Sequence, residues 1–205
     1  MKKATQPSLF DGLNSSALAI DKDVNRAVAQ RSLSGRDKAH GSIYTKPEVV
    51  GFILDLAGYK ITKPLHDYRI LEPSFGGGDF LLPMIDRLVD SALKHGIDPS
   101  VENLKECICG VELHQETWLR TRRKVIQRLQ RSVSPEVAER LADKWLVQGD
   151  FLLEPFGAGF DFIVGNPPYV RQELISASLL SEYKSRYSTL YDRADLYVPL
   201  IQQSL

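Results

Sequence analysis

The sequence predicts a doubly wound α/β domain with a mostly parallel β-sheet, and three observations lead to this prediction. Short apolar runs alternate with helical patterns along the chain, which is typical of βαβ units. The chain has 205 residues, of which 43% are hydrophobic and 25% charged, so it is long enough to bury a substantial core. Glycines and polar residues follow the apolar runs, and sheets of this kind bind ligands beyond the carboxyl ends of their strands. We therefore expect a Rossmann-like architecture.

The expected elements follow one another in a regular order. Strands are expected at residues 68–71, 107–111, 145–148 and 160–164. Helices are expected at residues 20–30, 80–95, 115–131 and 135–143. Gly96 is expected to end the second of these helices, and Ser134 to cap the fourth.

A further helix is expected to begin at Pro47. The segment Thr45-Lys46-Pro47-Glu48 has the spacing of a capping box, and a proline in the first turn needs no N–H group. Gly58 is expected to end this helix. Apolar residues occupy nearly all of its sides, which predicts that it is buried: Val49, Val50, Phe52, Ile53 and Leu56.

The charge balance excludes a polybasic protein whose whole surface binds nucleic acid. Twenty-six Lys and Arg residues balance 26 Asp and Glu residues. A local basic surface still allows contact with phosphates. The densest basic stretch is the helix at 115–131, which carries Arg120, Arg122, Arg123, Lys124, Arg128 and Arg131. This stretch either contacts phosphates or forms a solvated outer face, and we favour the outer face because a helix after the second strand packs away from the ligand crevice.

The cysteines and the N-terminus predict a cytoplasmic protein without a membrane partner. Cys107 and Cys109 are expected on the same face of one strand, too close in sequence for an ordinary structural disulfide. Free thiols are typical of a reducing compartment. The first residues lack the apolar stretch of a signal peptide, and no apolar run reaches the ~20 residues that a membrane span needs.

Polar or strained residues follow all four predicted strands. Gly76 and Gly78 follow the first strand, in a segment that also contains Glu72, Ser74 and Phe80. Glycines there form either a tight turn or a close approach to a ligand, and Ser74 stands where the dinucleotide-binding fingerprint has its first glycine. After the second and third strands, Glu112 and Asp150 are placed to bind ribose hydroxyls and an adenine amino group, or to act as a solvated carboxylate and a turn cap. Their joint placement favours a binding site.

The segment Asn166-Pro167-Pro168-Tyr169 after the fourth strand carries the most specific signal. Two consecutive prolines fix an extended backbone, which holds the Asn166 side chain and the Pro167 carbonyl in place. These two acceptors suit an –NH₂ group, and the Tyr169 ring offers a surface on which a planar base can stack. The alternative interpretation is a proline turn with an asparagine cap.

The ordered set of motifs resembles the gamma class of adenine-N6 DNA methyltransferases of restriction–modification systems, which includes TaqI-like enzymes and type II methylases. The resemblance rests on N-P-P-Y after an apolar strand and on E-P-x-x-G-x-G-x-F about ninety residues earlier. Tyr44-Thr45-Lys46-Pro47 resembles the motif that precedes the first strand in that class. Further matches are Gly110-Val111-Glu112-Leu113, Gln148-Gly149-Asp150-Phe151 and Ala194-Asp195-Leu196-Tyr197. The similarity runs from about Gly41 to the end of the chain.

The resemblance implies the fold of the class I S-adenosylmethionine-dependent methyltransferases, with S-adenosylmethionine as cofactor and no metal. The implied cofactor-binding residues are Tyr44, Thr45, Glu72, Ser74, Gly76, Gly78, Phe80, Glu112, Asp150 and Phe151. The implied catalytic residues, which hold a flipped adenine of double-stranded DNA, are Asn166, Pro167, Pro168 and Tyr169. Two departures from the family pattern are His114, where an aspartate is usual, and the variant Ser74-Phe75 of the glycine loop.

Residues 1–40 are expected to form an N-terminal arm or cover, and residues 41–205 a catalytic domain with its first four strands. The chain stops in a helical pattern just after the fifth motif, so we expect the sheet to be incomplete at the C-terminus. A target-recognition domain or a partner subunit would then supply sequence recognition. The alternatives are an inactive cofactor-binding fragment, half of a split methyltransferase, or an enzyme that methylates RNA or a protein glutamine. The Tyr44-Thr45 motif and the Glu72-Pro73 pair count against the last of these.

Overall fold

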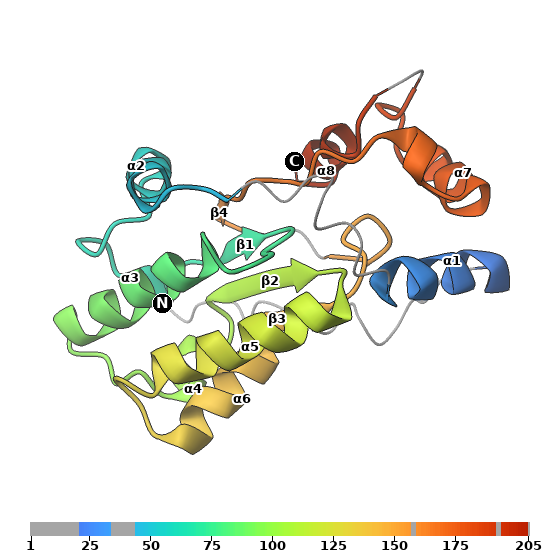
Figure 1. Cartoon of the computed structure of the whole chain (residues 1–205). Helices are drawn as coiled ribbons and strands as arrows, with labels where there is room; N and C mark the ends of the chain where they lie inside the picture. Colours follow the sequence, from blue (N-terminus) through green and yellow to red (C-terminus); the bar gives the residue numbers. More distant parts are fainter. Residues whose placement is uncertain (1–20, 34–43, 157–158, 192–193, 205) are drawn as a thin grey trace, which may run out of the picture.

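The computed structural model describes residues 21–33, 44–156, 159–191 and 194–204. Within these residues, four parallel strands form one sheet in the order β3-β2-β1-β4 (Figure 1). The strands are β1 Ile70–Glu72, β2 Ile108–Glu112, β3 Leu146–Gln148 and β4 Phe162–Ile163. The α/β class and the parallel sheet predicted from the sequence are therefore confirmed.

Helices precede, connect and follow the strands. They are α1 Lys22–Leu33, α2 Pro47–Ala57, α3 Leu81–Lys94, α4 Val101–Leu104, α5 Gln115–Leu129, α6 Pro135–Trp145, α7 Ala177–Arg186 and α8 Tyr197–Ser204. Single 3-10 turns lie at Leu65–Asp67 and Gln172–Leu174. The predicted helices match α1, α2, α3, α5 and α6 to within a few residues, and Ser134 caps α6 as predicted by accepting the Val137 N–H. Ile20 and the rest of the predicted N-terminal arm outside 21–33 lie outside the described residues.

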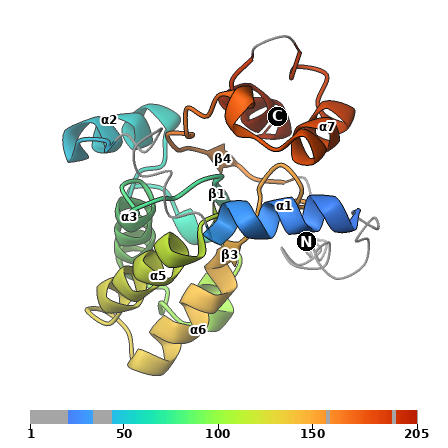
Figure 2. The same ribbon diagram turned by 45° about the vertical axis from the view of Figure 1, so that its right-hand side comes forward.

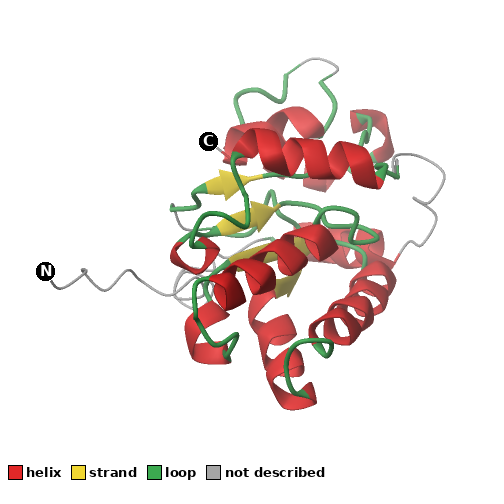
Figure 3. Ribbon diagram, turned by 90° about the vertical axis from the view of Figure 1, so that its left-hand side faces the viewer, coloured by secondary structure: helices red, strands yellow, loops and turns green. Residues whose placement is uncertain are grey.

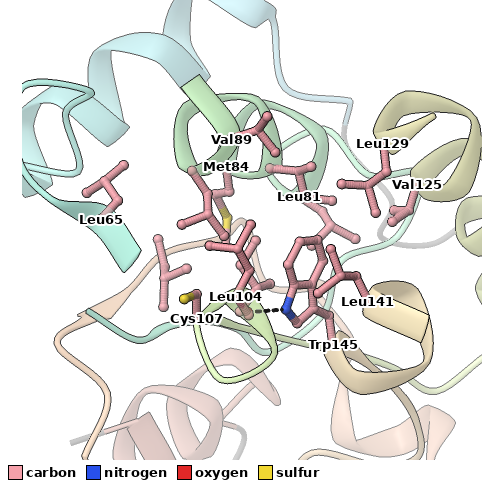
Figure 4. Close-up of a cluster of buried hydrophobic side chains, with 14 of the residues drawn as sticks. Leu65, Leu81, Met84, Val89, Leu104, Cys107, Val125, Leu129, Leu141 and Trp145 are labelled. Atoms are coloured by element: carbon pink, nitrogen blue, oxygen red, sulfur yellow. Dashed lines mark hydrogen bonds between the residues drawn. The ribbon is translucent and has the colours of Figure 1, made fainter. Parts of the chain in front are cut away.

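Helices cover both faces of the sheet, which is what the doubly wound prediction requires. Figure 2 shows α3, α5 and α6 on one side of the strands and α1, α7 and α8 on the other, and Figure 3 shows the strands between helices. The strands alternate accordingly: Ile70 and Ile108 contribute to the first apolar cluster, Leu71 and Cys109 to the second. Trp145 is buried at the centre of the first cluster, where its indole N–H donates to the Leu104 carbonyl at 2.9 Å (Figure 4).

The prediction that the two cysteines share a face is wrong. Cys107 belongs to the first apolar cluster and Cys109 to the second. The reason is that β2 begins only at Ile108, so the strand alternation does not extend back to Cys107. Both thiols are free and buried, and burial raises the pKa of each to about 12. They are therefore inert core residues.

The helix α2 corrects two further predictions. It is not buried on all sides, because only Val50 and Leu54 are fully buried while Phe52 is 66% exposed and Leu56 75% exposed. The helix packs mainly against α3, so a single stripe of its surface is covered. Its N-cap is Lys46, which makes no side-chain cap, so the capping box predicted at Thr45 is not formed. The predicted end of the helix is confirmed, with Gly58 in the left-handed conformation at φ 82°.

The basic residues of α5 bind mainly to other parts of the same molecule. Arg122 pairs with Asp143 of α6 at 2.6 Å, and Arg128 pairs with Asp86 of α3. Lys124 donates to the Gly77 carbonyl at 2.9 Å. The Arg122 and Arg128 ion pairs support the outer-face interpretation of this helix over a phosphate-binding one, whereas Lys124 reaches the glycine loop after β1.

None of the helices in the described ranges is both long enough and apolar enough to cross a membrane.

Candidate functional site

The segments that follow the four strands meet at one edge of the sheet, as the parallel arrangement predicts. The Phe75 N–H after β1 donates to the Val111 carbonyl of β2 at 2.9 Å. The Gly149 N–H after β3 donates to the Glu112 carbonyl at 3.0 Å. On the other side of β1, the Val164 N–H donates to the Leu71 carbonyl at 3.0 Å. Backbone hydrogen bonds therefore fix the strand ends relative to one another.

The glycine loop between β1 and α3 is held on two sides. The Gly76 N–H donates to Glu112 Oε2 at 2.9 Å, and the Gly76 carbonyl accepts from the buried Thr121 hydroxyl of α5 at 2.7 Å. Gly76 has a φ of 49°, and a Cβ added there would meet no atom within 4 Å. The loop is thus anchored through both backbone groups of Gly76 and leaves open space where a ligand can approach its backbone.

Gly78 is required for a different reason. Its φ is 90°, and a Cβ at this position would lie 3.1 Å from the Thr121 methyl carbon and 3.3 Å from Leu82 Cγ. Both a left-handed backbone and close packing against α3 and α5 therefore demand glycine here. At Gly78 the helices α3 and α5 leave no room for a side chain, so this position of the loop must remain glycine.

Three carboxyl groups surround the loop. Glu72 at the end of β1 is 2% exposed and its Oε2 atom has no hydrogen-bond partner. Glu112 is 4% exposed and accepts from the His114 N–H through Oε1 at 2.8 Å. Burial, and then the charges of Asp79 and Glu112, raise the pKa of Glu72 well above its usual range. Glu72 Oε2 is therefore a buried oxygen without a hydrogen-bond partner, which is the arrangement expected where a ligand supplies the donor.

Thr45 connects the segment before α2 to this edge of the sheet. Its backbone N–H donates to Asp79 Oδ2 at 2.9 Å, and its hydroxyl oxygen accepts from Asn166 Nδ2 at 3.3 Å. Gly165 lies against Glu72, since a Cβ on it would be 3.5 Å from Glu72 Cγ. The predicted residues after β1 and β4 thus lie side by side with Thr45 between them. Tyr44, the neighbour of Thr45, is 69% exposed.

A pocket of about 270 Å³ adjoins Asn166. It is lined by Pro73, Ser74, Ile163, Val164, Gly165, Asn166, Pro167, Leu200, Ile201 and Ser204. Tyr169 is 48% exposed, and its ring centroid lies 5.8 Å from that of Tyr197 in α8. The Leu196 N–H donates to the Val170 carbonyl at 3.0 Å, so the residue before α8 is hydrogen-bonded to the residue that follows Tyr169. The Tyr169 ring is accessible for stacking on a planar ligand.

Asp150 has both carboxylate oxygens engaged within the protein. Oδ1 accepts from the Leu152 N–H at 3.1 Å, and Oδ2 accepts from the Tyr183 hydroxyl of α7. Burial and the Asp150 charge raise the pKa of Tyr183, so this hydroxyl stays a donor. The structure thus contains the turn cap that the sequence offered as an alternative role for Asp150.

Two of the predicted site residues lie in the apolar core. Phe80 is 2% exposed within the first cluster. Phe151 is 4% exposed within the second cluster, where its ring stacks on Phe156 with centroids 5.1 Å apart. Both rings are therefore core residues in this structure. Among the described residues there is also no group of three or more His, Cys, Asp or Glu side chains that would hold a metal ion.

Sequence reasoning missed several residues that shape the site. Asp79, Thr121 and Tyr183 were not singled out, and Lys124 and Tyr197 were named in the basic stretch and in a motif match without a role at the site. Thr121 and Tyr183 are polar residues at positions that face a core, which is a weak signal in the sequence. Asp79 follows the glycines directly, and that adjacency was the clearest available sign of its role.

Replacing Glu72 by glutamine is expected to change how stability depends on pH. Because the folded pKa of Glu72 lies above the ordinary value of 4.5, its contribution to stability is fully present below that value and is lost as the pH rises through the folded pKa. Glutamine mimics the protonated acid, so Glu72→Gln should gain in unfolding free energy relative to the wild type as the pH rises above 4.5. Urea denaturation across this range measures the difference.

The matched control for this experiment is Glu139→Gln, at an exposed position in the middle of α6 and away from the site. Its difference from the wild type should change less with pH than that of Glu72→Gln. A constant difference for Glu72→Gln would contradict the raised pKa.

The chain is similar to type II methyltransferases of several bacteria. The family model described as Eco57I restriction-modification methylase matches residues 106–205. The type II methyltransferase M.PaeR7I of Pseudomonas aeruginosa is 53% identical over 186 residues, which are 89% of this chain and 32% of that protein. M.XhoI of Xanthomonas vasicola is 49% identical (80% of this chain, 31% of that protein), and M.BstVI of Geobacillus stearothermophilus is 46% identical (82% and 31%). The chain spans about a third of the length of these relatives, and it belongs to the Eco57I family of type II restriction–modification methyltransferases.

Proposed function

We propose that the protein transfers a methyl group from S-adenosylmethionine to the N6 amino group of adenine in double-stranded DNA, as the modification part of a restriction–modification system. One observation carries the proposal: Asn166 lies next to the glycine loop and its carboxylates, with Thr45 between them. The relatives named type II methyltransferases support a DNA substrate. We place the reaction in the cytoplasm, which suits the free buried thiols.

The described residues fit S-adenosylmethionine. The open side of Gly76 leaves room for a ligand against the loop backbone, and the Glu72 oxygen without a partner suits the ammonium group of a methionine. Glu112, whose two oxygens already accept backbone N–H groups, is oriented to accept further hydrogen bonds from ribose hydroxyls. When bound, the cofactor supplies a methyl group on a positively charged sulfur, which is an electrophile.

The task left to the protein is to make a weak nucleophile reactive. The lone pair of the adenine amino nitrogen is delocalised into the ring. Asn166 Oδ1 and the Pro167 carbonyl accept the two amino hydrogens, which draws the lone pair out of conjugation and aims it at the methyl group. This is catalysis by positioning and electrostatics, and it requires no serine, cysteine or histidine nucleophile.

The target adenine must leave the duplex before these acceptors can reach it. Tyr169 then stacks on the extruded base, and its 48% exposed ring is available for this contact. Tyr197 lies beside it and supports the ring from α8. Recognition of the DNA sequence belongs, in this proposal, to a target-recognition part or a partner subunit, since the relatives are about three times as long as this chain.

Glu112→Ala is expected to weaken cofactor binding. Loss of the charged acceptor removes the ribose contact and frees the Gly76 N–H, so the binding free energy should fall by about 1–3 kcal/mol. Isothermal calorimetry with S-adenosylmethionine measures it. Glu112→Gln keeps an acceptor oxygen and should lose less. Equal affinity of the alanine variant and the wild type would refute the assignment.

Asn166→Ala is expected to reduce turnover while leaving cofactor affinity nearly intact. Removing one preorganised transition-state hydrogen bond typically lowers kcat by about 10²- to 10³-fold. The assay is transfer of tritiated methyl groups from the cofactor to DNA by the full-length natural protein, with the labelled nucleoside identified after digestion. Label on cytosine, on RNA or on a protein glutamine would overturn the proposed substrate, and normal turnover of the variant would overturn the role of Asn166.

Tyr169→Ala is expected to weaken capture of the extruded base rather than cofactor binding. Stacking contributes about 1–3 kcal/mol per base, so the KM for DNA should rise while the Kd for the cofactor stays the same. Tyr169→Phe and Tyr169→Trp keep a ring and should stay close to the wild type. If the phenylalanine variant is as impaired as the alanine variant, the hydroxyl matters and the stacking role is wrong.

A further inference from the structure

We propose that Thr121 of α5 is a positioning residue for cofactor binding, because its hydroxyl sets the direction of the Gly77 N–H in the glycine loop. The inference rests on the proposed function and gives that N–H a partner, the carboxylate in the methionine part of S-adenosylmethionine. It is carried by the hydrogen bonds of the loop backbone.

The peptide planes before and after the one that joins Gly76 to Gly77 are each held by two hydrogen bonds. In the plane before it, the Gly76 N–H donates to Glu112 Oε2 at 2.9 Å. The carbonyl of that same plane accepts from the Gly78 N–H at 2.8 Å. In the plane after it, this Gly78 N–H is joined by the Gly77 carbonyl, which accepts from Lys124 Nζ at 2.9 Å.

Among the described residues, Thr121 alone holds the plane that joins Gly76 to Gly77. The Gly76 carbonyl accepts from Thr121 Oγ1 at 2.7 Å, and none of the described residues accepts a hydrogen bond from the Gly77 N–H. A carbonyl oxygen can only accept, so the hydroxyl must be the donor. The C=O and N–H groups of a trans peptide point in opposite directions. The Thr121 bond therefore also sets the direction of the Gly77 N–H.

This arrangement turns the Gly77 N–H outward. Thr121 is fully buried, so the Gly76 carbonyl points toward the interior and the N–H of the same plane points away from it. The loop has space for a ligand, because a Cβ on Gly76 would meet no atom within 4 Å. A backbone N–H held in this way is a suitable donor to a carboxylate.

The charges around the loop favour a ligand that carries both an ammonium and a carboxylate group. Glu72, Asp79 and Glu112 would repel an isolated anion, and the unpartnered Glu72 Oε2 suits an ammonium group. Lys124 brings a positive charge to the loop from α5. The methionine part of S-adenosylmethionine carries both groups. In this proposal Glu72 meets its ammonium end, and Thr121 acts on its carboxylate end through the loop.

The test separates the hydroxyl of Thr121 from its methyl group. In the full-length natural protein, Thr121→Val removes the hydroxyl and should raise the Kd for S-adenosylmethionine about tenfold, the effect of losing one hydrogen bond. Decarboxylated S-adenosylmethionine keeps the ammonium and sulfonium groups, so its Kd should change by less than about twofold. Thr121→Ser keeps the hydroxyl and should bind S-adenosylmethionine within about twofold of the wild type. Isothermal calorimetry measures these affinities.

Thr189→Val is the matched control, because it removes a hydroxyl that donates to Gln202 of α8 at 2.6 Å and not to the glycine loop. Its Kd for both ligands should be that of the wild type. An equal loss of affinity for both ligands in Thr121→Val, or no loss for S-adenosylmethionine, would overturn the proposal. If Thr121→Val does not fold by circular dichroism, Thr121→Ala is compared with Thr121→Ser. These two variants differ only by the hydroxyl, and the same outcomes decide.

The wild type separates this proposal from the proposed function. Methylation of cytosine by the wild type would overturn the adenine assignment, while the binding experiment would still decide the role of Thr121. Failure of the wild type to bind S-adenosylmethionine would overturn both.

Discussion

The pairing of β1 with a parallel strand on each side is the constraint on which the site depends. Ile70 is in register with Ile108 of β2 and with Phe162 of β4. Three parallel strands in register must end at the same edge of the sheet. The residues that follow them are therefore brought together by the strand pairing itself, before any side-chain contact is needed. The hydrogen bonds among the strand ends then convert this closeness into a fixed geometry.

Acidic side chains gather at this edge of the sheet, where burial disfavours their charged form. Glu72, Asp79 and Glu112 lie near one another, and burial together with the other two charges raises the pKa of Glu72. Glu112 is satisfied by backbone N–H groups, as is Asp79 by Thr45. Glu72 Oε2 alone among these carboxylate oxygens is buried without a donor. An acid kept in such a position is expensive for the fold and is typical of a functional site.

The sequence predicted the parts of the fold that are encoded locally. The strand and helix segments, the Gly58 helix end and the Ser134 cap all follow from short-range patterns. The convergence of the strand ends also followed, because it is a property of parallel sheets. The predictions failed where a distant partner decided the outcome. Thr45 is not a helix cap because α2 begins one residue later, with Lys46 as N-cap, and the Thr45 hydroxyl and N–H bind Asn166 and Asp79 instead. The helix α2 is half exposed because it packs mainly on one neighbour.

The contacts that tie the site together were beyond local reasoning for the same reason. The Tyr183–Asp150 bond joins residues 33 positions apart, and Thr121 reaches Gly76 across 45 positions. The serine-rich segment of α7 has too few apolar residues at helical spacing to predict a helix. The contact of its Tyr183 with Asp150 could therefore not be predicted either. Motif residues could be named from the sequence, but the residues that orient them could not.

At this site, several acidic side chains are buried while two aromatic rings are exposed. Glu72, Glu112 and Asp150 are buried there, while Tyr44 and Tyr169 are 69% and 48% exposed. This inverts the usual arrangement, in which charges face water and aromatic rings are covered. Tyr44 and Tyr169 belong to the segments that contain Thr45 and Asn166, so in the proposed function their exposed rings offer flat apolar surface near hydrogen-bonding groups, which suits a base with an amino substituent. The inversion is a reason to regard the site as built for planar, polar-edged ligands rather than as an incidental gap between strand ends.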